Sequence, residues 1–510
     1  MKKDKIIFWF GIDFTQYCIS YYFEKNYDSE NYAIIDVTNQ TKNFFKKQEL
    51  VKLKKFWFIH DQYEYNFKKP DIEYLKNFEE KYKINLWQLA FNERIFYGFF
   101  DFHKFSNDEI LYIVEKICRF YEKILDEIEP DYFITKLTTF HHLELFRRMC
   151  ISKGVKVLML SNPKIPKKII ISEDDTKIDY ENSLDKYSPK HFSFEEVRDF
   201  YNHLSSNAKA KELVQKFWKN HGSSSILKTI TIFILFLLSK SKNEKTNYNY
   251  YGMSKWNILK KFLILRIKKK IRENFINKYF LTEIPQNINY VFFPLSVVLE
   301  RHILIGAPYS INQIELVKNI AKSLPVNYNL VIKEHPAQSS REWRTISEYK
   351  DLLKVPNTIV MHPSSNDEIL IKNSSLIITT AGSIGFQSSL YGKPCLVFGD
   401  VIYSYLPSVK KIMSLETLPQ LIRDSLKIKP IPEDVSKYLQ MLDHNSIDFD
   451  FLQFTSLFSH EFFFDGGYND MFVNQNMLEK FIVKNKNILL PLTMEHIKKI
   501  NQHKNRKSIS

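Results

Sequence analysis

Four of the twelve glycines in this chain stand close together, at Gly382, Gly385, Gly392 and Gly399. They punctuate the run LIITTAGSIGFQSSLYGKPCLVFG, which begins at residue 376. Its apolar start predicts a buried parallel strand, followed by a hydroxyl-rich turn, a short helix that Gly392 ends, and a second strand. Such a turn presents free N–H groups and the positive end of a helix dipole at the carboxyl end of a strand. The run therefore predicts an α/β unit with a site for a phosphate or diphosphate.

Length and composition bound the remaining possibilities. At 510 residues the chain is too long for one core, and 44% hydrophobic residues with 15% aromatics exclude a disordered chain. The net charge of +15 favours an anionic partner such as nucleic acid, an acidic membrane surface, or phosphorylated or acidic sugars. The four cysteines have no metal-ligand spacing, which fits a reducing cytoplasm. The first residues read as a strand rather than a signal peptide, and the longest uncharged apolar run, 229–238, is about half of the ~20 residues that a membrane span needs.

Two stretches show the alternation of strands and helices that is typical of doubly wound sheets. In the first stretch we expect strands at 5–10, 32–37, 55–60, 132–135 and 156–160, with helices at 14–25, 108–128 and 141–152. In the second stretch we expect strands at 290–295, 329–333, 358–361, 376–378 and 395–398, with a helix at 312–323. From about residue 164 the alternation breaks down into charged and polar residues. The chain is thus divided into a Rossmann-like domain at 1–190, a helical, basic linker region at 191–285, a second Rossmann-like domain at 286–430 and a helical extension at 431–510.

The linker region contains an unusually basic helix at 254–280. It carries nine Lys and Arg residues against one Glu, and Ile264, Ile267, Ile271 and Phe275 fall on one stripe. A basic amphipathic helix of this kind can lie on an anionic membrane. It can equally be the solvated face of a helix packed between domains, and the sequence leaves both readings open.

Three predicted strands of the second domain end in polar residues. Because ligands of parallel sheets bind beyond the carboxyl ends of the strands, we expect these ends to converge on one anion site. A His-Pro dipeptide follows each of the strands 329–333 and 358–361, although His335 or His362 could instead bond a nearby backbone carbonyl. The candidate ligand-binding residues are Lys333, Glu334, His335, Pro336, Ser364, Ser365, Thr380, Gly382 and Ser383.

The segment 290–405 resembles the capsular polysaccharide biosynthesis family, which includes the Kdo transferases of capsule and lipopolysaccharide assembly. The likeness rests on YVFFPL, on the strand end IKEHP, on TTAGSIGFQSSLYGKPCLVFG and on the aromatic Tyr403 that follows. In the first domain LWQLAFNERIFY, EPDYFIT and GVKVLML look similar to the same family. The resemblance covers most of the chain apart from 164–250 and the last residues.

The resemblance implies a glycosyltransferase of the GT-B type, with two Rossmann-like domains that face a central cleft. The C-terminal domain would bind a nucleotide-sugar, with His335, Pro336 and Gly382 to Ser383 at its phosphate, and the N-terminal domain would bind the acceptor. The sequence departs from the family at Gln387, where many members have a glutamate that grips ribose, and in the loop after YVFFPL, where only Glu300 remains of the usual pattern. A CMP-linked, Kdo-like acid is the favoured donor.

Glycosyl transfer needs a carboxylate at the anomeric carbon and positive charge near the leaving phosphate. The candidate carboxylates of the first domain are Asp13 and Glu93, the latter beside Arg94. Asp13 could equally cap the helix that follows, and Glu93 with Arg94 could form an interdomain ion pair. His141, with Lys136 and His142, follows a predicted strand and could meet an acidic acceptor. No Asp-x-Asp pair stands at a strand end, so we expect no metal, and the nucleotide-sugar is a co-substrate rather than a bound cofactor.

The sequence therefore predicts a cytoplasmic glycosyltransferase, associated with the inner face of the plasma membrane through its basic surface. It would add a sugar to a capsule, lipopolysaccharide or other surface glycan, or to its lipid-linked form. The alternatives are a polyol-phosphate transferase or a UDP-sugar epimerase of similar architecture, and a non-catalytic GT-B scaffold of a glycan assembly complex. Nucleic acid is an unfavourable partner because the positive charge peaks in a single helix rather than along a stripe with exposed aromatics.

Overall fold

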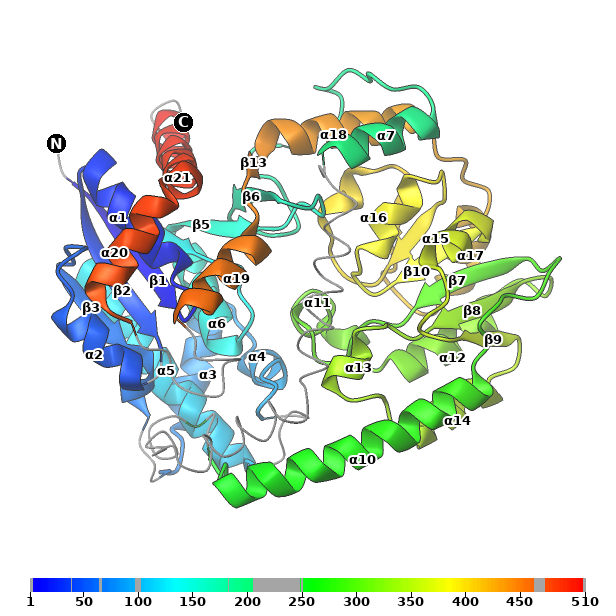
Figure 1. Ribbon diagram of the computed structural model, residues 1–510, viewed down its shortest axis with the longest axis horizontal. Helices are drawn as coiled ribbons and strands as arrows, with labels where there is room; N and C mark the ends of the chain where they lie inside the picture. Colours follow the sequence, from blue (N-terminus) through cyan, green and yellow to red (C-terminus); the bar gives the residue numbers. More distant parts are fainter. Residues whose placement is uncertain are drawn as a thin grey trace.

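A computed structural model describes residues 3–37, 39–63, 67–96, 102–181, 183–204, 248, 251–462 and 473–507. Within these residues the chain forms two α/β units, each built on a largely parallel sheet with helices on both faces (Figure 1). The predicted apolar run at 229–238 lies outside the described residues. Among the described helices, none combines the length and the apolar character that crossing a bilayer would require.

The first sheet has the strand order β13-β6-β5-β4-β1-β2-β3 among the described residues. Strands β1 to β5 are parallel and confirm the predicted alternation, whereas β6 and β13 are antiparallel additions at one edge. The sequence reading missed β6 because its short apolar core stands among charged residues. The strands are β1 (Asp4–Gly11), β2 (Ser29–Asp36), β3 (Lys55–Phe58), β4 (Tyr132–Thr135), β5 (Lys156–Ser161), β6 (Lys168–Ser172) and β13 (Ile447–Asp448).

Alternating side chains of this sheet enter two different cores. In β1, Phe8 and Phe10 pack on one face together with helices α1 and α19 to α21, whereas Ile7 and Trp9 pack on the other face with α3 to α6. A capping box of Ser106 and Glu109 begins α5, as expected of a serine followed three residues later by a glutamate. The helices of this unit are α1 (Thr15–Asn26), α2 (Asn39–Lys47), α3 (Ile72–Tyr82), α4 (Leu86–Phe91), α5 (Asn107–Ile128) and α6 (His141–Ser152), with a 3-10 turn η1 (Ile59–Gln62).

The second sheet is parallel throughout its described strands, in the order β12-β11-β10-β7-β8-β9. If β7 is counted as strand 1 and β12 as strand 6, the order from β9 to β12 is 3-2-1-4-5-6, which is the Rossmann order. The direction in which strands are added reverses between β7 and β10. The strands are β7 (Tyr290–Pro294), β8 (Asn329–Lys333), β9 (Thr358–Met361), β10 (Leu376–Thr379), β11 (Cys395–Val397) and β12 (Val409–Lys411). The helices are α11 (Arg301–Leu304), α12 (Gln313–Ser323), α13 (Gln338–Arg341), α14 (Ile346–Lys354), α15 (Asp367–Asn373), α16 (Ile384–Ser389) and α17 (Leu418–Ser425), with 3-10 turns η4 (Pro308–Ser310) and η5 (Ile402–Tyr405).

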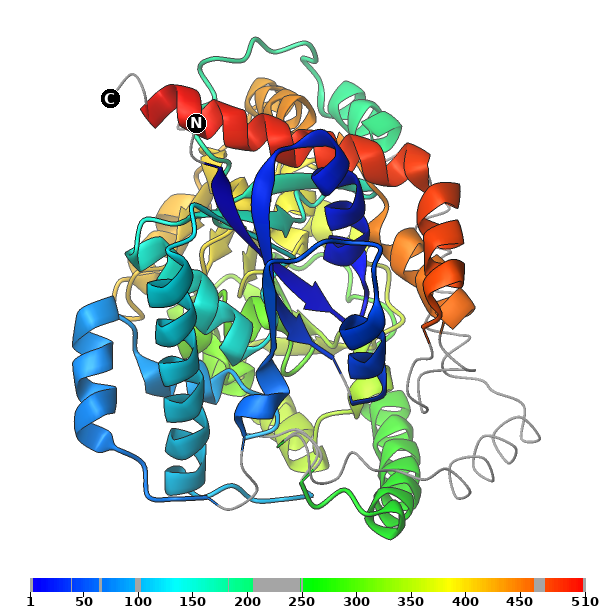
Figure 2. The same cartoon turned by 90° about the vertical axis from the view of Figure 1, so that its left-hand side faces the viewer.

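The linker and the tail connect the two units. Helix α10 (Lys255–Tyr279) runs from the first unit to the second, while α7 (Phe194–Leu204) and α18 (Pro432–Asn445) pack together beside the second (Figure 1). Helices α19 (Phe451–Phe462), α20 (Gln475–Lys484) and α21 (Lys486–Lys507) then return to the first unit, where α21 lies along α1 (Figure 2). The segment 431–510 is therefore shared between the two cores rather than set apart from them. The loop expected at 465–468 lies outside the described residues.

The carboxyl ends of the two sheets meet at one arginine. Arg301, which follows β7, makes a bidentate ion pair with Asp175, with nitrogen to oxygen distances of 2.6 and 2.9 Å, and its Nε donates to the carbonyl oxygen of Thr138. Thr138 in turn follows β4 of the first sheet. Because β7 and β4 are central strands, their loops bring the ligand-binding edges of the two sheets face to face. The expected GT-B type of fold, with two facing Rossmann-like units, is confirmed.

Candidate functional site

Asp13 and Lys136 form an ion pair where β1 and β4 end. Both side chains keep some exposure, 14% for Asp13 and 21% for Lys136. Burial alone would raise the pKa of Asp13, but Lys136 outweighs it and holds that pKa below its ordinary value. The end of the Lys136 side chain passes over Gly11, where a Cβ would lie 2.6 Å from its Nζ. Asp13 also accepts a hydrogen bond from the N–H of Thr15, the first residue of α1, although the N-cap residue itself is Phe14 and has no side-chain cap.

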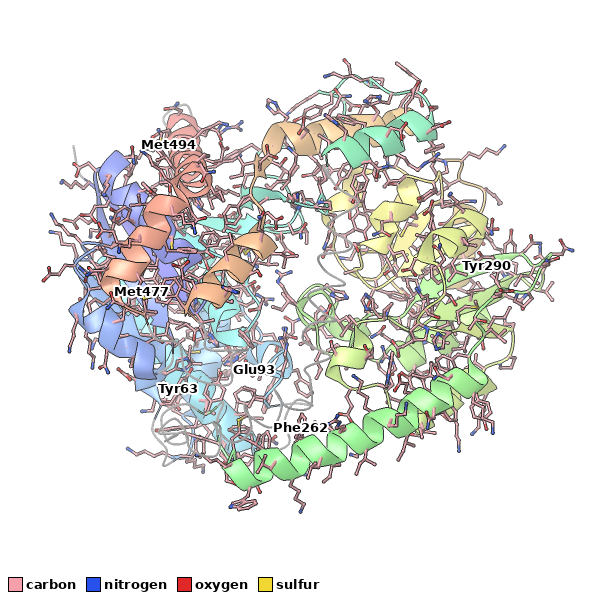
Figure 3. All side chains as sticks on the ribbon, in the orientation of Figure 1. Tyr63, Glu93, Phe262, Tyr290, Met477 and Met494 are labelled. Atoms are coloured by element: carbon pink, nitrogen blue, oxygen red, sulfur yellow. The ribbon has the colours of Figure 1, made fainter. Side chains whose placement is uncertain are left out.

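Glu93 lies deeper in the same unit, after α4. Figure 3 labels Glu93 within the first unit. It is 1% exposed and bonds Nδ1 of His141, which is equally buried, at 2.6 Å. The Arg94 guanidinium lies over the ring of Phe140, 5.3 Å from its centroid. Burial would raise the pKa of Glu93, but the hydrogen bond and charge of His141 lower it. His141 is thus the partner that the structure gives to Glu93.

A further buried cluster, which the sequence reading did not single out, surrounds Asp36 at the end of β2. One carboxylate oxygen lies 2.8 Å from Nε2 of His60, and the other lies 3.1 Å from Nε2 of His142. The His142 ring stacks on Trp9 and on Phe140. Burial would raise the pKa of Asp36, but the two histidines hold it well below its usual range. The rule that polar residues follow strand ends could have found Asp36, which comes directly after the apolar part of its strand.

In the second unit, Glu334 is fully buried and serves the framework of the site. Its carboxylate accepts from Nε of Arg344 at 2.9 Å, from the hydroxyl of Tyr349 at 3.0 Å and from the N–H of His335 at 2.7 Å. Arg344 also donates to the carbonyl oxygen of Ser296, just beyond β7. The network joins the loops after β7 and β8. Glu334 is therefore not placed to contact a ligand, in contrast to its expected role as a binding residue.

The residues next to this network are distributed between the surface and the interior. His335 and Pro336 are exposed, and Glu300 is half-buried beside His302, 3.3 Å away. Lys333 is 3% exposed and pairs with Asp367 at 2.6 Å. Its positive charge is thus already met by a carboxylate. His335 and Pro336 are the members of the predicted IKEHP strand end that remain accessible to a ligand.

Packing within the protein accounts for the glycine cluster of the sequence. A Cβ on Gly385 would lie 2.5 Å from the hydroxyl of Tyr403, and one on Gly399 would lie 2.3 Å from the carbonyl oxygen of Gly306. Gly392 ends its helix with a φ of +64°, as predicted. The Tyr403 hydroxyl donates to the carbonyl oxygen of Gly382 at 2.6 Å. The close approach that the glycines indicated is thus made by other parts of the chain.

The polar residues around this turn differ in accessibility. Thr380 is buried and shares a hydrogen bond with the hydroxyl of Ser296 at 2.8 Å. Ser383 is exposed, whereas Gly382 and Gln387 are half-buried. Helix α16 is only six residues long. The exposed side of the turn is therefore formed by Ser383, next to Gly382.

Ser364 and Ser365 do not join the other strand ends. They follow β9, which lies at the edge of the sheet, two strands away from β7. Ser364 bonds Nδ1 of His362 at 2.6 Å, and Nε2 of that ring bonds Asn277 of α10 at 3.0 Å. Ser365 donates to the carbonyl oxygen of Thr282. These residues attach the end of α10 to the sheet, so the expected convergence of three strand ends is replaced by that of β7, β8 and β10.

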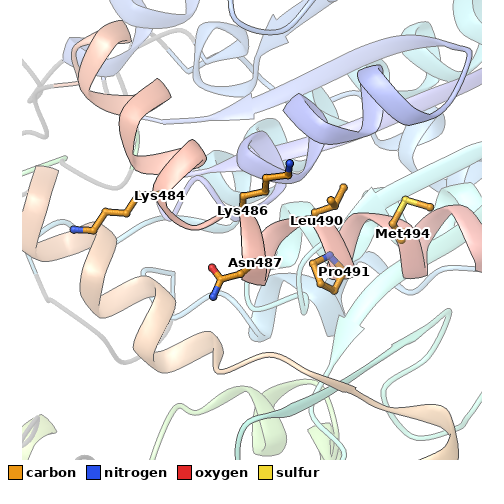
Figure 4. Close-up of a pocket in the computed structure, with 6 residues that line it drawn as sticks. All are labelled: Lys484, Lys486, Asn487, Leu490, Pro491 and Met494. Atoms are coloured by element: carbon orange, nitrogen blue, oxygen red, sulfur yellow. The ribbon is translucent and has the colours of Figure 1, made fainter.

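A surface hollow of about 670 Å³ lies elsewhere (Figure 4). None of the candidate site residues lines it. Its lining residues belong to α20 and α21 and are Lys484, Lys486, Asn487, Leu490, Pro491 and Met494. It is separate from the facing strand ends of the two sheets.

Comparison with solved structures gives remote likenesses. UDP-GlcNAc 2-epimerase from Methanocaldococcus jannaschii is 14% identical with a TM-score of 0.24, and the match covers 86% of this chain and 99% of that one. The β-Kdo 2,7 transferase KpsC from Thermosulfurimonas dismutans is 15% identical with a TM-score of 0.29, covering 71% and 98%. UDP-GlcNAc 2-epimerase from Neisseria meningitidis, bound to UDP-GlcNAc, is 15% identical with a TM-score of 0.24, covering 86% and 98%. TM-scores this far below 0.5 carry no argument about activity.

The sequence comparisons are more specific. No curated protein matches the chain. Residues 194–406 match the family model described as capsule polysaccharide biosynthesis protein, and the matched segment contains the ends of β7, β8 and β10. Over these residues the chain is similar to the capsule polysaccharide biosynthesis proteins, and the family resemblance predicted from its sequence is confirmed.

Proposed function

We propose that this protein is a glycosyltransferase that moves a sugar from a nucleotide-sugar donor onto a capsule or related surface glycan. The observation that carries the proposal is the family match over 194–406, which includes the strand ends of the second sheet. The bidentate contact of Arg301 with Asp175 supports it, because it sets those strand ends opposite the corresponding ends of the first sheet. A donor held by one unit would thereby face an acceptor held by the other.

The donor would lie at the point where the second sheet reverses its strand order, between β7 and β10. His335 and Pro336 on one side and Gly382 with Ser383 on the other would contact its phosphate, and Gln387 its ribose. Glu300 would border the sugar from the loop after β7. An imidazole, a hydroxyl and main-chain N–H groups suit a single phosphate, which is the chemistry of a CMP-linked sugar acid. The loops that hold these residues would be fixed by the buried side chains of Glu334, Lys333 and Thr380, without contact with the donor.

Asp13 is the carboxylate that we propose for the chemical step. It remains ionised because Lys136 lowers its pKa, and it keeps partial exposure at the end of β1. As the acceptor hydroxyl forms its bond to the anomeric carbon, Asp13 would take the hydroxyl proton while the donor phosphate leaves with the electron pair of the broken bond. Lys136 would hold the acidic acceptor. Glu93 is 1% exposed and would act through His141, with Arg94 at the same loop.

A nucleotide screen tests the donor site. We expect CMP to raise the Tm of the protein more than UDP, GDP or CDP does, because a bound ligand stabilises the folded state by mass action. His335→Ala should weaken CMP binding by about tenfold to a hundredfold, the loss of one hydrogen bond to a charged group. His362→Ala is the matched control, because His362 also precedes a proline but bonds Asn277 instead. Stabilisation by UDP alone would favour the epimerase alternative, and no response to any nucleotide would favour the scaffold.

We also propose that helix α10 rests on an anionic membrane surface. Ile276 is its one buried residue, and the outward face bears Trp256, Leu263, Ile267 and Ile271, which are 78%, 62%, 62% and 53% exposed. Their spacing of seven, four and four residues puts them on one stripe. Nine basic residues against one acidic residue on the helix complement anionic lipid headgroups. Phe275, which the sequence placed on the stripe, packs against the second unit instead.

Vesicle sedimentation tests this surface. We expect the protein to bind vesicles that contain phosphatidylglycerol and not vesicles of phosphatidylcholine alone, and to dissociate as salt screens the charges. Replacing Trp256, Leu263 and Ile267 together by serine should lower the bound fraction more than tenfold by removing the apolar contact. Tyr309→Ser serves as the control, since Tyr309 is 87% exposed on the short turn η4. Equal binding to both kinds of vesicle would contradict the proposal.

A further inference from the structure

Three potential metal ligands meet inside the first unit, although the sequence analysis predicts no metal. We propose that Glu93, His141 and His142 bind one divalent transition-metal ion, with zinc as the best match. One ligand atom from each of the three lies within 4.8 Å of the other two, and all three residues are buried. Two imidazoles and one carboxylate form a common protein donor set for zinc, which accepts a water molecule as its fourth ligand. This proposal goes beyond the glycosyltransferase activity, and it gives Glu93 and His141 a metal-binding role in addition to the one proposed above.

An unsatisfied nitrogen atom supports the assignment. Nδ1 of His142 is buried without a hydrogen-bond partner among the described residues. Leaving a buried polar atom without a partner costs folding free energy. Buried histidine nitrogens therefore normally bond a carbonyl or hydroxyl group. A metal ion would satisfy Nδ1 of His142 by accepting the lone pair that this nitrogen carries in the neutral imidazole.

Asp36 supplies the outer contact that metal-binding histidines usually have. Its carboxylate lies 3.1 Å from Nε2 of His142, which assigns the ring proton to that nitrogen and leaves Nδ1 free for a metal. Stacking of the His142 ring on Trp9 and Phe140 fixes the plane of the ring. The tautomer and the direction of the free nitrogen are therefore both set by the fold.

The charges of the interior also favour a cation. The carboxylates of Asp36 and Glu93 are 21% and 1% exposed, and both have histidine neighbours, which carry a full positive charge only when protonated. A divalent ion would supply it directly.

The geometry needs a modest adjustment. Metal–ligand distances of about 2.0–2.2 Å place the ligand atoms of a tetrahedral site roughly 3.4 Å apart, so the 2.6 Å contact between Glu93 and His141 would open and the wider gaps would close. Glu93 follows α4, whereas the two histidines begin α6. The ion would therefore join the end of α4 to the start of α6.

Metal analysis of the full-length protein tests the proposal. The chelator-treated protein should take up about one equivalent of Zn²⁺, and its Tm should rise on metal addition and fall again with chelator. Co²⁺ in place of Zn²⁺ should give the visible absorption of a four-coordinate site. Failure of the unchanged protein to retain either metal, with a Tm that chelator does not alter, would overturn the proposal without any variant.

Variants locate the ion. Glu93→Gln preserves the size of the side chain and its contact with His141, and should weaken Zn²⁺ binding at least tenfold. Asp36→Asn, which removes the charge of the outer contact and of the pair with His60, should weaken it by about tenfold. His103→Gln is the matched control, because His103 also pairs with a carboxylate of the same unit, that of Glu109 at 3.2 Å, but lies outside the cluster. Equal loss of metal in the control, or none in Glu93→Gln, would assign the binding to other histidines and overturn the site.

Discussion

Glu334→Gln is expected to lower the free energy of unfolding by about 3–5 kcal/mol. The substitution preserves shape but removes the charge that compensates Arg344, and both side chains are buried, at 0% and 3% exposure. The buried guanidinium then keeps neutral acceptors such as the carbonyl oxygen of Ser296, but no carboxylate compensates its charge. Equilibrium urea unfolding of the two proteins measures the difference, read for the transition that contains the second unit.

The double variant Glu334→Gln, Arg344→Met separates the loss of the pair from the burial of a lone charge. Because a buried ion pair replaced by apolar groups is often close to neutral, we expect the double variant to recover most of the stability that Glu334→Gln loses. A double variant that is less stable than the single one would show that Arg344 contributes chiefly through its bond to Ser296. If Glu334→Gln were as stable as the unchanged protein, the ion pair of Glu334 with Arg344 would not contribute to the stability of the second unit.

Asp13→Asn is expected to lower kcat by about 10²–10⁴-fold, the usual contribution of a general base. The amide keeps the hydrogen bond to the N–H of Thr15 but can neither take the acceptor proton nor pair with the charge of Lys136. Binding of CMP, measured by thermal shift, should be unchanged, because Asp13 belongs to the other unit. The readout is sugar transfer from a CMP-linked donor under saturating conditions.

Asp126→Asn provides the control for this experiment. Asp126 is also an aspartate of the first unit paired with a lysine, Lys153 at 3.0 Å, but it lies on the exposed face of α5. It should leave kcat unchanged. Normal turnover by Asp13→Asn would transfer the catalytic role to another carboxylate, while loss of nucleotide binding together with turnover would indicate a structural effect.

Local sequence signals predicted the framework of the fold well. The strands β8 and β9 and the helix α6 have the predicted bounds, because their apolar runs are framed by Asn, Pro, His or Ser residues that begin or end regular structure. The signal failed for β6, whose partners are β5 and a two-residue strand from the tail. An edge strand of this kind depends on contacts made by a segment that lies far along the chain.

The candidate site was predictable only in part, for two physical reasons. The predicted ends of strands indicate which residues reach the ligand-binding edge of a sheet. Asp13 and His335 were proposed as site residues in this way. The strand ends do not tell which of those residues face inward: Glu334 and His335 are neighbours, yet the first is buried in an ion pair and the second is exposed. The pairing of Asp36 with His60 and His142, and of Glu93 with His141, joins segments that no short pattern relates.

The return of α20 and α21 to the first unit has a consequence for how the protein is made. Leu478, Phe481, Leu489 and Leu492 complete the core that begins with β1 and α1, so one face of the first sheet stays only partly covered until the ribosome has translated the whole of the second unit. The second core also needs α18, but little beyond it. The unit that is synthesised first is therefore completed last, and nascent chains should expose its apolar face to chaperones during most of elongation.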